Sequence, residues 1–245
     1  REIGITIAEV PGSGPGARIS VEDVKAYAKQ LLSGGAAQVG AVAEPPLPDL
    51  SKWGEVEALP MSSIRRVTAE HLTRAWRTVP HVTQFDRADI TKLEKLRKDL
   101  ASAAEAAGGR LTVTAILIKA LSAALKKFPQ FNSCVDMASR QIIQRKYCHV
   151  GVAVDTDRGL LVPVIRDADK KNIVEIAVEL GQLAEKARGG SLGIDDMQGG
   201  CITVTNLGGI GGVAFTPIIN WPEVAILGVS RSEQLPVWAG DRFEP

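Results

Sequence analysis

The chain has 245 residues, of which 45% are hydrophobic and 23% charged, and its formal net charge is +1. That length allows one sizeable hydrophobic core and a small additional module in a soluble, globular protein. The near-neutral charge argues against a nucleic-acid partner, which requires a basic surface, and no apolar run approaches the roughly 18 residues of a membrane-spanning helix. Its three cysteines are scattered and form no Cys-x-x-Cys pair, so we expect no metal site and reduced, buried thiols in a cytosolic compartment.

Residues 1–32 form the first predicted unit, a small helical module. The spacing Ser20-x-x-Asp23 is typical of a capping box, in which two side chains satisfy free N–H groups at the start of a helix. A tight loop of glycines and a proline, residues 12–18, precedes it. Residues 33–58 are rich in Ala, Gly and Pro without any periodicity, which predicts a flexible linker.

From Pro60 onward the pattern predicts an α/β domain in which helices and strands alternate. Thr91-x-x-Glu94 predicts a second capping box near the start of a long helix, and Gly108 is expected to end that helix. The sequence Thr156–Gly159 predicts a turn between two strands. The expected helices are 62–76, 89–107, 112–127 and 172–188, and the expected strands are 81–86, 142–155, 160–165, 201–206 and 224–229.

The stretch from 201 to 230 carries the strongest local signal. Its first six residues alternate, so Thr203 and Thr205 should share one strand face, opposite Ile202 and Val204. Four glycines within residues 208–212 then allow a sharp turn and a close approach to another group. The glycines also fit a relaxed dinucleotide-binding pattern, but that motif must open a helix, and the two prolines that follow forbid one. A hydroxyl group at a strand end beside glycine backbone is suited to holding a small reacting group.

The three histidines give no catalytic motif of their own. His71 is expected on the surface of a helix, His149 is interpreted as a structural strand residue, and His81 follows a proline where it could line a pocket. None has a carboxylate four residues later, and none belongs to a recognisable motif with Ser or Cys. From residue types alone, the chain does not look like a complete enzyme.

The N-terminal module resembles a known family of small domains. Residues 2–4, 10–19 and 22–24 resemble the peripheral subunit-binding domain of 2-oxo acid dehydrogenase complexes. In that family, basic side chains bind the acidic surface of dihydrolipoamide dehydrogenase or of the 2-oxo acid decarboxylase, and Arg18 and Arg1 match this partner-binding role. The first helix of that domain normally begins before Arg1, so we expect the module to be truncated at its N-terminus.

Residues 59–245 resemble the catalytic domain of the dihydrolipoamide acyltransferases, most closely the acetyltransferase of bacterial pyruvate dehydrogenase complexes. The resemblance implies the α/β fold of chloramphenicol acetyltransferase, a two-layer sandwich of mixed sheet and helices. It also implies a homotrimer with active sites between subunits, and assembly of the trimers into a cubic or dodecahedral core. The matching stretches are 79–85, 131–133, 149–155, 159–166 and 201–229.

The family moves an acyl group between the thiol of a dihydrolipoyl group and coenzyme A. The resemblance places the lipoyl group on an upstream domain outside this chain. It assigns the oxyanion donor to Thr205 and a contact with the 3′-phosphate of coenzyme A to Arg97. The family's base is the histidine of a His-x-x-x-Asp-Gly motif, which falls after the position of Pro245.

Two interpretations follow from this resemblance. The first is an acyltransferase truncated at both ends, with fragment 1–245 inactive alone. The second is a non-catalytic core or docking component that keeps the fold and lacks the base. We favour the first, because Phe243-Glu244-Pro245 stops just before a core strand of the family. The expected location is the bacterial cytoplasm, or the mitochondrial matrix in a eukaryote.

Overall fold

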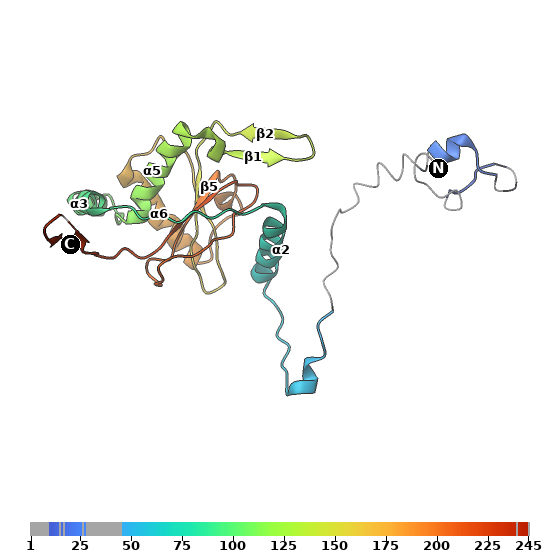
Figure 1. The fold of residues 1–245 in the computed structure, drawn as a ribbon, viewed down its shortest axis with the longest axis horizontal. Coiled ribbons are helices and arrows are strands. Elements are labelled where there is room, and N and C mark those ends of the chain that lie inside the picture. Colours follow the sequence, from blue (N-terminus) through green and yellow to red (C-terminus); the bar gives the residue numbers. More distant parts are fainter. Residues whose placement is uncertain are drawn as a thin grey trace. The chain divides into compact units, whose positions relative to one another are not determined.

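The computed structural model describes residues 10–14, 16, 18–25, 27, 46–238 and 240–244 (Figure 1). The chain divides into two compact units, Arg1–Leu59 and Pro60–Pro245. Arg1 and residues 28–45 lie outside the described residues, so the partner-binding role of Arg1 and most of the predicted linker stay predictions. No helix in the described part is long and apolar enough to cross a membrane.

The first unit contains the predicted capping box. The Ser20 hydroxyl accepts a hydrogen bond from the Asp23 N–H at 3.2 Å, and the Asp23 carboxylate accepts one from the Ser20 N–H at 2.8 Å. Residues 21–25 and 27 are helical. The Ser13 hydroxyl also donates to Asp23 at 2.6 Å, and its hydrogen bond is the main reason that the pKa of Asp23 lies well below its usual range. The carboxylate therefore joins the preceding loop to the start of this helix.

The second unit combines helices with a mixed sheet. The helical elements of the described chain are η2 (Leu50–Trp53), which belongs to the first unit, and α2 (Ser63–Thr78), α3 (Thr91–Asp99), α4 (Ala101–Ala106), α5 (Val113–Lys127), η3 (Pro129–Asn132), α6 (Ile173–Arg188) and η4 (Asp195–Met197). The strands are β1 (Ser133–Asp136), β2 (Gln141–Gln144), β3 (Val150–Val152), β4 (Val164–Ile165), β5 (Ile202–Asn206), β6 (Ile226–Val229), β7 (Val237–Trp238) and β8 (Phe243–Glu244).

The central sheet has four strands in the order β4-β3-β5-β6. Strand β3 is antiparallel to β4 and parallel to β5, and β5 is parallel to β6. Two separate hairpins pair β1 with β2 and β7 with β8. This mixed sheet with helices on it is the architecture that the sequence predicts.

The hydrophobic core lies between one face of the central sheet and helices α5 and α6, which run across it in Figure 1. Ile118 of α5 and Ile176 of α6 are fully buried against the sheet residues Val150, Ile165 and Val204, each of which has no exposed surface. Full burial of one such side chain stabilises a fold by roughly 1.5–3 kcal/mol. The helical pattern and the strand alternation meet in this layer, as predicted.

The long helix predicted for residues 89–107 is two helices. The chain breaks between α3 and α4 at Leu100, a turn residue that ends one helix and precedes the next. The predicted capping box at Thr91 is wrong, because Ile90 occupies the N-cap position and makes no side-chain cap. The N–H of Thr91 instead donates to Asp89 at 2.8 Å. Gly108 ends the second helix with a φ of +81°, as expected.

The long strand predicted for residues 142–155 is interrupted after β2. The side-chain amide of Asn132 donates to the carbonyl oxygens of Arg145 and Tyr147, at 3.2 and 2.8 Å. These bonds occupy backbone groups that a continuous strand would offer to a neighbour, so β2 pairs with β1 and β3 begins at Val150. The predicted turn is present, and the Gly159 N–H donates to the Thr156 carbonyl at 2.9 Å.

The strand predicted for residues 81–86 is absent. The segment has no strand partner within the described chain, and Val82 is 93% exposed and Phe85 55% exposed. A favourable residue pattern cannot make a strand without a neighbouring backbone to pair with.

A buried carboxyl group connects the sheet to the loop before β6. Glu223 is 3% exposed, and it accepts hydrogen bonds from the Thr203 hydroxyl at 2.7 Å and the Asn220 amide at 3.3 Å. The other end of the Asn220 amide lies 3.0 Å from Nε2 of His71 on α2. Burial raises the pKa of Glu223 to about 7, despite the hydrogen bonds that favour its charged form.

We predict that Glu223→Gln removes a pH-dependent loss of stability. Because the pKa of Glu223 is about 7 in the folded chain and ordinarily 4.5, the folded state holds more protons between these values. The contribution of protonated Glu223 to the free energy of unfolding is therefore fully present below about pH 4.5 and is lost as the pH rises to about 7. We expect the free energy of unfolding of the parent to fall, relative to that of the variant, by on the order of 3 kcal/mol between pH 4.5 and 7. Denaturant unfolding at a series of pH values measures both.

A matched control is Glu233→Gln, which changes an exposed glutamate and should leave the pH profile of unfolding unchanged. Parallel profiles for the parent and Glu223→Gln between pH 4.5 and 7 would contradict the raised pKa of this buried group.

Candidate functional site

The candidate site lies at the carboxyl end of β5, where the strand runs into the glycine-rich segment. Thr205 is half-buried and pairs with Gly228 in the parallel ladder of β5 and β6. Its hydroxyl group makes no hydrogen bond with any described residue, whereas the Thr203 hydroxyl on the same face is bound to Glu223. The core side chains Ile202 and Val204 point to the opposite face, as the alternation predicts. The free hydroxyl of Thr205 can therefore donate to a bound molecule.

An aromatic ring packs over Gly228, the strand partner of Thr205. Gly228 has no side chain, and a Cβ atom placed there would lie 3.0 Å from Cζ of Phe215. Paired residues on parallel strands project to the same face of a sheet, so the ring of Phe215 occupies the space next to Thr205. The sequence analysis did not identify Phe215; a glycine inside an apolar strand run was the available signal of a close approach.

The glycine-rich segment forms turns and no helix. The Leu207 N–H donates to the Val229 carbonyl at 2.9 Å, and the N–H groups of Ile210 and Gly211 both donate to the Leu207 carbonyl. Gly211 and Gly212 have φ values of +114° and +89°, which side chains rarely tolerate. A dinucleotide-binding loop must open a helix, so this geometry agrees with the exclusion made from the sequence.

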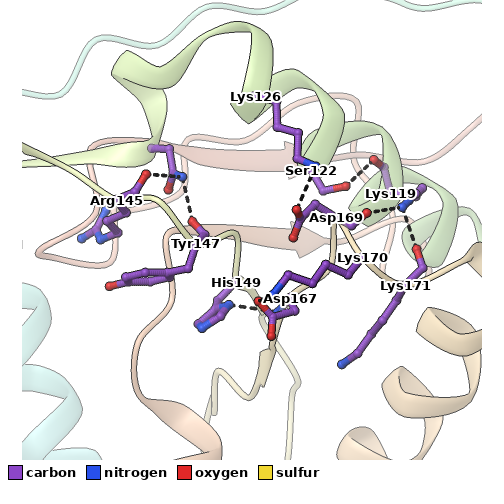
Figure 2. Close-up of polar contacts among 11 residues, drawn as sticks. Lys119, Ser122, Lys126, Arg145, Tyr147, His149, Asp167, Asp169, Lys170 and Lys171 are labelled. Atoms are coloured by element: carbon purple, nitrogen blue, oxygen red, sulfur yellow. Dashed lines mark hydrogen bonds and ion pairs between the residues drawn. The ribbon is translucent and has the colours of Figure 1, made fainter.

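His149 and His81 are not available as general bases in this geometry, because one ring nitrogen of each already accepts a backbone N–H. His149 accepts the Asp167 N–H at Nδ1, 2.9 Å away, and packs against the ring of Tyr147 (Figure 2). Nε2 of His81 accepts the Ile219 N–H at 3.0 Å, so its Nδ1 carries the proton directed at the Val79 carbonyl. These contacts give His149 the structural role that was predicted and give His81 one as well.

The prediction that His71 is a surface residue is wrong. Its ring is half-buried on the inner side of α2 and lies within hydrogen-bond distance of Asn220. Polar neighbours in the sequence suggested exposure, but the helix turns this position towards the network of Glu223.

Lysine side chains hold the loop that precedes α6. The Lys119 ammonium donates to the carbonyl oxygens of Asp169 and Lys171 at 2.8 and 2.6 Å, and Lys126 pairs with the Asp169 carboxylate at 2.8 Å (Figure 2). These contacts join α5 to the loop beside His149 and account for both lysines structurally.

Two of the arginines with predicted binding roles, Arg97 and Arg18, lie within the described residues. Arg97 lies on α3, is 30% exposed at its side chain and pairs with Glu94 at 2.9 Å. Arg18 is exposed in the first unit, and its carbonyl accepts the Gly14 N–H at 3.1 Å. No contact of either guanidinium group with a ligand or partner is present, so both binding roles stay predictions.

Two of the three cysteines are buried, as predicted, whereas Cys134 is half-buried. Burial raises the pKa of the Cys148 thiol to about 11 and also raises that of Cys201, which leaves both protonated and unreactive at neutral pH. Among the described residues, no three His, Cys, Asp or Glu side chains gather closely enough to hold a metal ion.

The mixed sheet with helices on one face is an α/β architecture, and comparison with known families places the chain among the acyltransferases. The chain belongs to the 2-oxoacid dehydrogenase acyltransferase family, whose catalytic domain matches residues 54–245. It is 50% identical over 251 residues to the dihydrolipoyllysine-residue acetyltransferase component of the pyruvate dehydrogenase complex of Pseudomonas aeruginosa. The corresponding component of Azotobacter vinelandii is 48% identical over 252 residues. Both alignments include the whole chain, but they cover only 46% and 40% of those relatives.

Solved structures agree with this assignment. The Azotobacter vinelandii dihydrolipoamide acetyltransferase, in which the catalytic roles of a serine, a histidine and an asparagine were studied, superposes with a TM-score of 0.78 at 52% identity. The cubic core of a pyruvate dehydrogenase multienzyme complex gives 0.78 at 51% identity. Each match covers 82% of this chain and 84% of the other. The fold and family inferred from the sequence are thereby confirmed.

We predict that Gly228→Ala destabilises the chain by about 1–2 kcal/mol, because the added methyl group overpacks the ring of Phe215. Gly209→Ala is the matched control, since a Cβ at position 209 meets no atom within 4 Å, and it should stay within about 0.5 kcal/mol of the parent. Denaturant unfolding of both variants measures the difference. Equal stability of the two would show that Phe215 does not pack tightly against Gly228.

Proposed function

We propose that the chain transfers an acyl group, specifically acetyl, between the thiol of a dihydrolipoyl group and that of coenzyme A. The observation that carries this proposal is the half-buried hydroxyl of Thr205, which has no partner among the described residues and lies at the carboxyl end of a parallel strand. Family membership supports it. The dihydrolipoyl group is a substrate, and we place it on another domain of the whole protein.

The proposed reaction exchanges one thioester for another. The sulfur of coenzyme A attacks the carbonyl carbon of the acyl-dihydrolipoyl thioester, and a new C–S bond forms while the carbonyl oxygen becomes negative. The bond to the dihydrolipoyl sulfur then breaks, and that sulfur takes up the proton lost by the attacking thiol. Thr205 stabilises the intermediate by donating its hydroxyl hydrogen to the oxyanion. The Azotobacter vinelandii relative, whose studied residues include a serine, gives a precedent for a hydroxyl group in such a site.

Proton transfer requires a base that we do not assign to His81 or His149, because one ring nitrogen of each already accepts a backbone N–H. We do not assign it to His71 either, because its ring is held in the Glu223 network through Asn220. Residues 1–245 contain no His-x-x-x-Asp-Gly stretch. We propose that this motif of the family supplies the base in the whole protein. The alternative function, a non-catalytic core or docking component, is favoured by the same engagement of the three histidines.

Arg97 is proposed to bind the 3′-phosphate of coenzyme A. Its guanidinium group donates to Glu94 through Nε and Nη2, which orients the side chain, and part of it stays exposed. A planar guanidinium suits phosphate recognition, because it presents several donors at once.

We propose that the second unit assembles into trimers and a larger core. The hairpin of β1 and β2 exposes several large apolar side chains that a second copy could cover, and the cubic core among the matching structures supports the proposal. These side chains are Val135, Met137, Ile142 and Ile143.

We further propose that the first unit docks dihydrolipoamide dehydrogenase or the 2-oxo acid decarboxylase through Arg18, which is exposed beside the capped helix. The free cysteines Cys134, Cys148 and Cys201 are compatible with a reducing compartment, the bacterial cytoplasm.

The experiment that tests acyl transfer is Thr205→Val in the whole acyltransferase assembled in its complex. Valine keeps the β-branched shape and removes the hydroxyl donor, so turnover should fall about 100- to 1000-fold, roughly 3–4 kcal/mol of transition-state stabilisation. The KM values should change little, because the hydrogen bond matters mainly in the transition state.

Thr205→Ser is the control and should retain most activity, since the hydroxyl survives. The turnover of the parent and of both Thr205 variants is measured as steady-state acetyl transfer from acetyl-CoA to dihydrolipoamide. A correctly assembled Val variant that turns over within about threefold of the parent has lost under 1 kcal/mol, and Thr205 is then only a strand residue.

For docking, Arg18→Glu in the whole protein should weaken binding of the partner subunit by on the order of 2–5 kcal/mol, because it reverses a charge at the proposed ion pair. Calorimetric titration with the purified partner gives the affinity. Lys52→Glu, the same charge change at an exposed position of the first unit, is the control. Equal affinities for the two variants would place Arg18 outside the interface.

A further inference from the structure

The residue after Thr205 connects two layers of the fold. Asn206 is the last residue of β5, and by strand alternation its side chain points away from the face that carries the Thr205 hydroxyl. Its Nδ2 donates to Oγ1 of Thr114 on α5, 3.0 Å away, across 92 positions of sequence. The carboxyl end of the strand is thereby joined to the first turn of a core helix.

The other end of the Asn206 amide holds the glycine-rich segment. Its Oδ1 accepts the Gly208 N–H at 2.7 Å, while the intervening Leu207 N–H donates to Val229 of the neighbouring strand at 2.9 Å. Both ends of one side-chain amide are in use, which fixes its rotation. The backbone that leaves Thr205 is therefore held by the sheet on one side and by α5 on the other.

The helix end that receives this bond is rigid. Thr112 caps α5, and its hydroxyl accepts the Ala115 N–H at 3.2 Å. One turn further on, Ile118 has no exposed surface and lies in the centre of the core. Thr114 sits between the cap and the core, so its hydroxyl is a fixed point for the sheet end.

We propose that Asn206 and Thr114 form a clasp that positions the Thr205 hydroxyl and the glycine-rich segment for acyl transfer. The inference rests on the proposed function and assigns a positioning role to both residues. Asn206 is exposed, and an exposed hydrogen bond adds little to folding. The rate of catalysis, however, falls when a hydrogen-bond donor in the active site shifts by a fraction of an ångström. The clasp should therefore affect turnover more than stability.

The test uses Thr114→Val in the whole, assembled acyltransferase, since valine removes the hydroxyl and keeps the shape. We expect kcat for acetyl transfer from acetyl-CoA to dihydrolipoamide to fall about 3- to 10-fold, with KM within twofold and the Tm within about 2 °C of the parent. Thr114→Ser keeps the hydroxyl and should recover most of the loss. Thr73→Val, at an exposed position of α2, is the matched control and should change nothing.

A double-mutant cycle separates the clasp from two independent effects. Asn206→Ala removes the donor to Thr114 and also the acceptor of the Gly208 N–H. Its kcat should therefore fall at least as far as that of Thr114→Val. Combining the two should cost no more than Asn206→Ala alone, because each change breaks the same bond. Additive losses, a Thr114→Val enzyme within 1.5-fold of the parent, or a loss confined to KM would each overturn the clasp.

The Thr205→Val variant, assayed in parallel, separates this inference from the proposed function. If Thr205→Val loses 100-fold and Thr114→Val loses nothing, only the clasp is wrong. If Thr205→Val keeps parental turnover, the proposed oxyanion role fails and the clasp fails with it.

Discussion

The structure of the second unit depends on the apolar contact between one face of the central sheet and helices α5 and α6. Val150 and Val204 of the sheet and Ile118 of α5 are fully buried there, and burial on this scale is the main source of folding free energy. Strand alternation then fixes the face to which each neighbouring residue of β5 projects. Because Val204 must face the helices, Thr205 must face the other side, so the candidate site follows from the packing of the core.

The opposite face of the sheet carries a buried polar pair among apolar residues such as Val164. Thr203 and Glu223 are buried together, and the carboxyl group loses its hydration without gaining an ion pair at hydrogen-bond distance. A chain selected for stability alone would place an apolar pair there. The network instead connects the sheet through Asn220 to α2, and Thr205 keeps a hydroxyl that no described residue binds. Stability and site geometry are thus linked through two threonines on one strand.

Much of this arrangement could be predicted from the sequence, because periodicity reports local structure. The helices near 62–76, 112–127 and 172–188 were found almost where expected, and the alternation in β5 correctly assigned both faces. Some errors are local, such as the capping box at Thr91, whose N–H is bound by Asp89, and others arise from contacts between residues that are not neighbours in the sequence. Asn132 interrupts the strand predicted for 142–155, and Asn206 binds a helix 92 positions away. No local pattern contains such pairs. The fold and family of the chain were accessible from motifs, whereas the residues that surround Thr205 required the structure.

The central claim is that the Thr205 hydroxyl donates to the oxyanion of acyl transfer. The most direct measurement is a crystal structure of the whole acyltransferase with a stable tetrahedral mimic that joins coenzyme A to a dihydrolipoyl group. The account predicts that the Thr205 hydroxyl oxygen lies about 2.7–3.1 Å from the oxygen that stands in for the oxyanion. An oxyanion mimic bound only by backbone N–H groups of the glycine-rich segment, with Thr205 beyond hydrogen-bond distance, would contradict it.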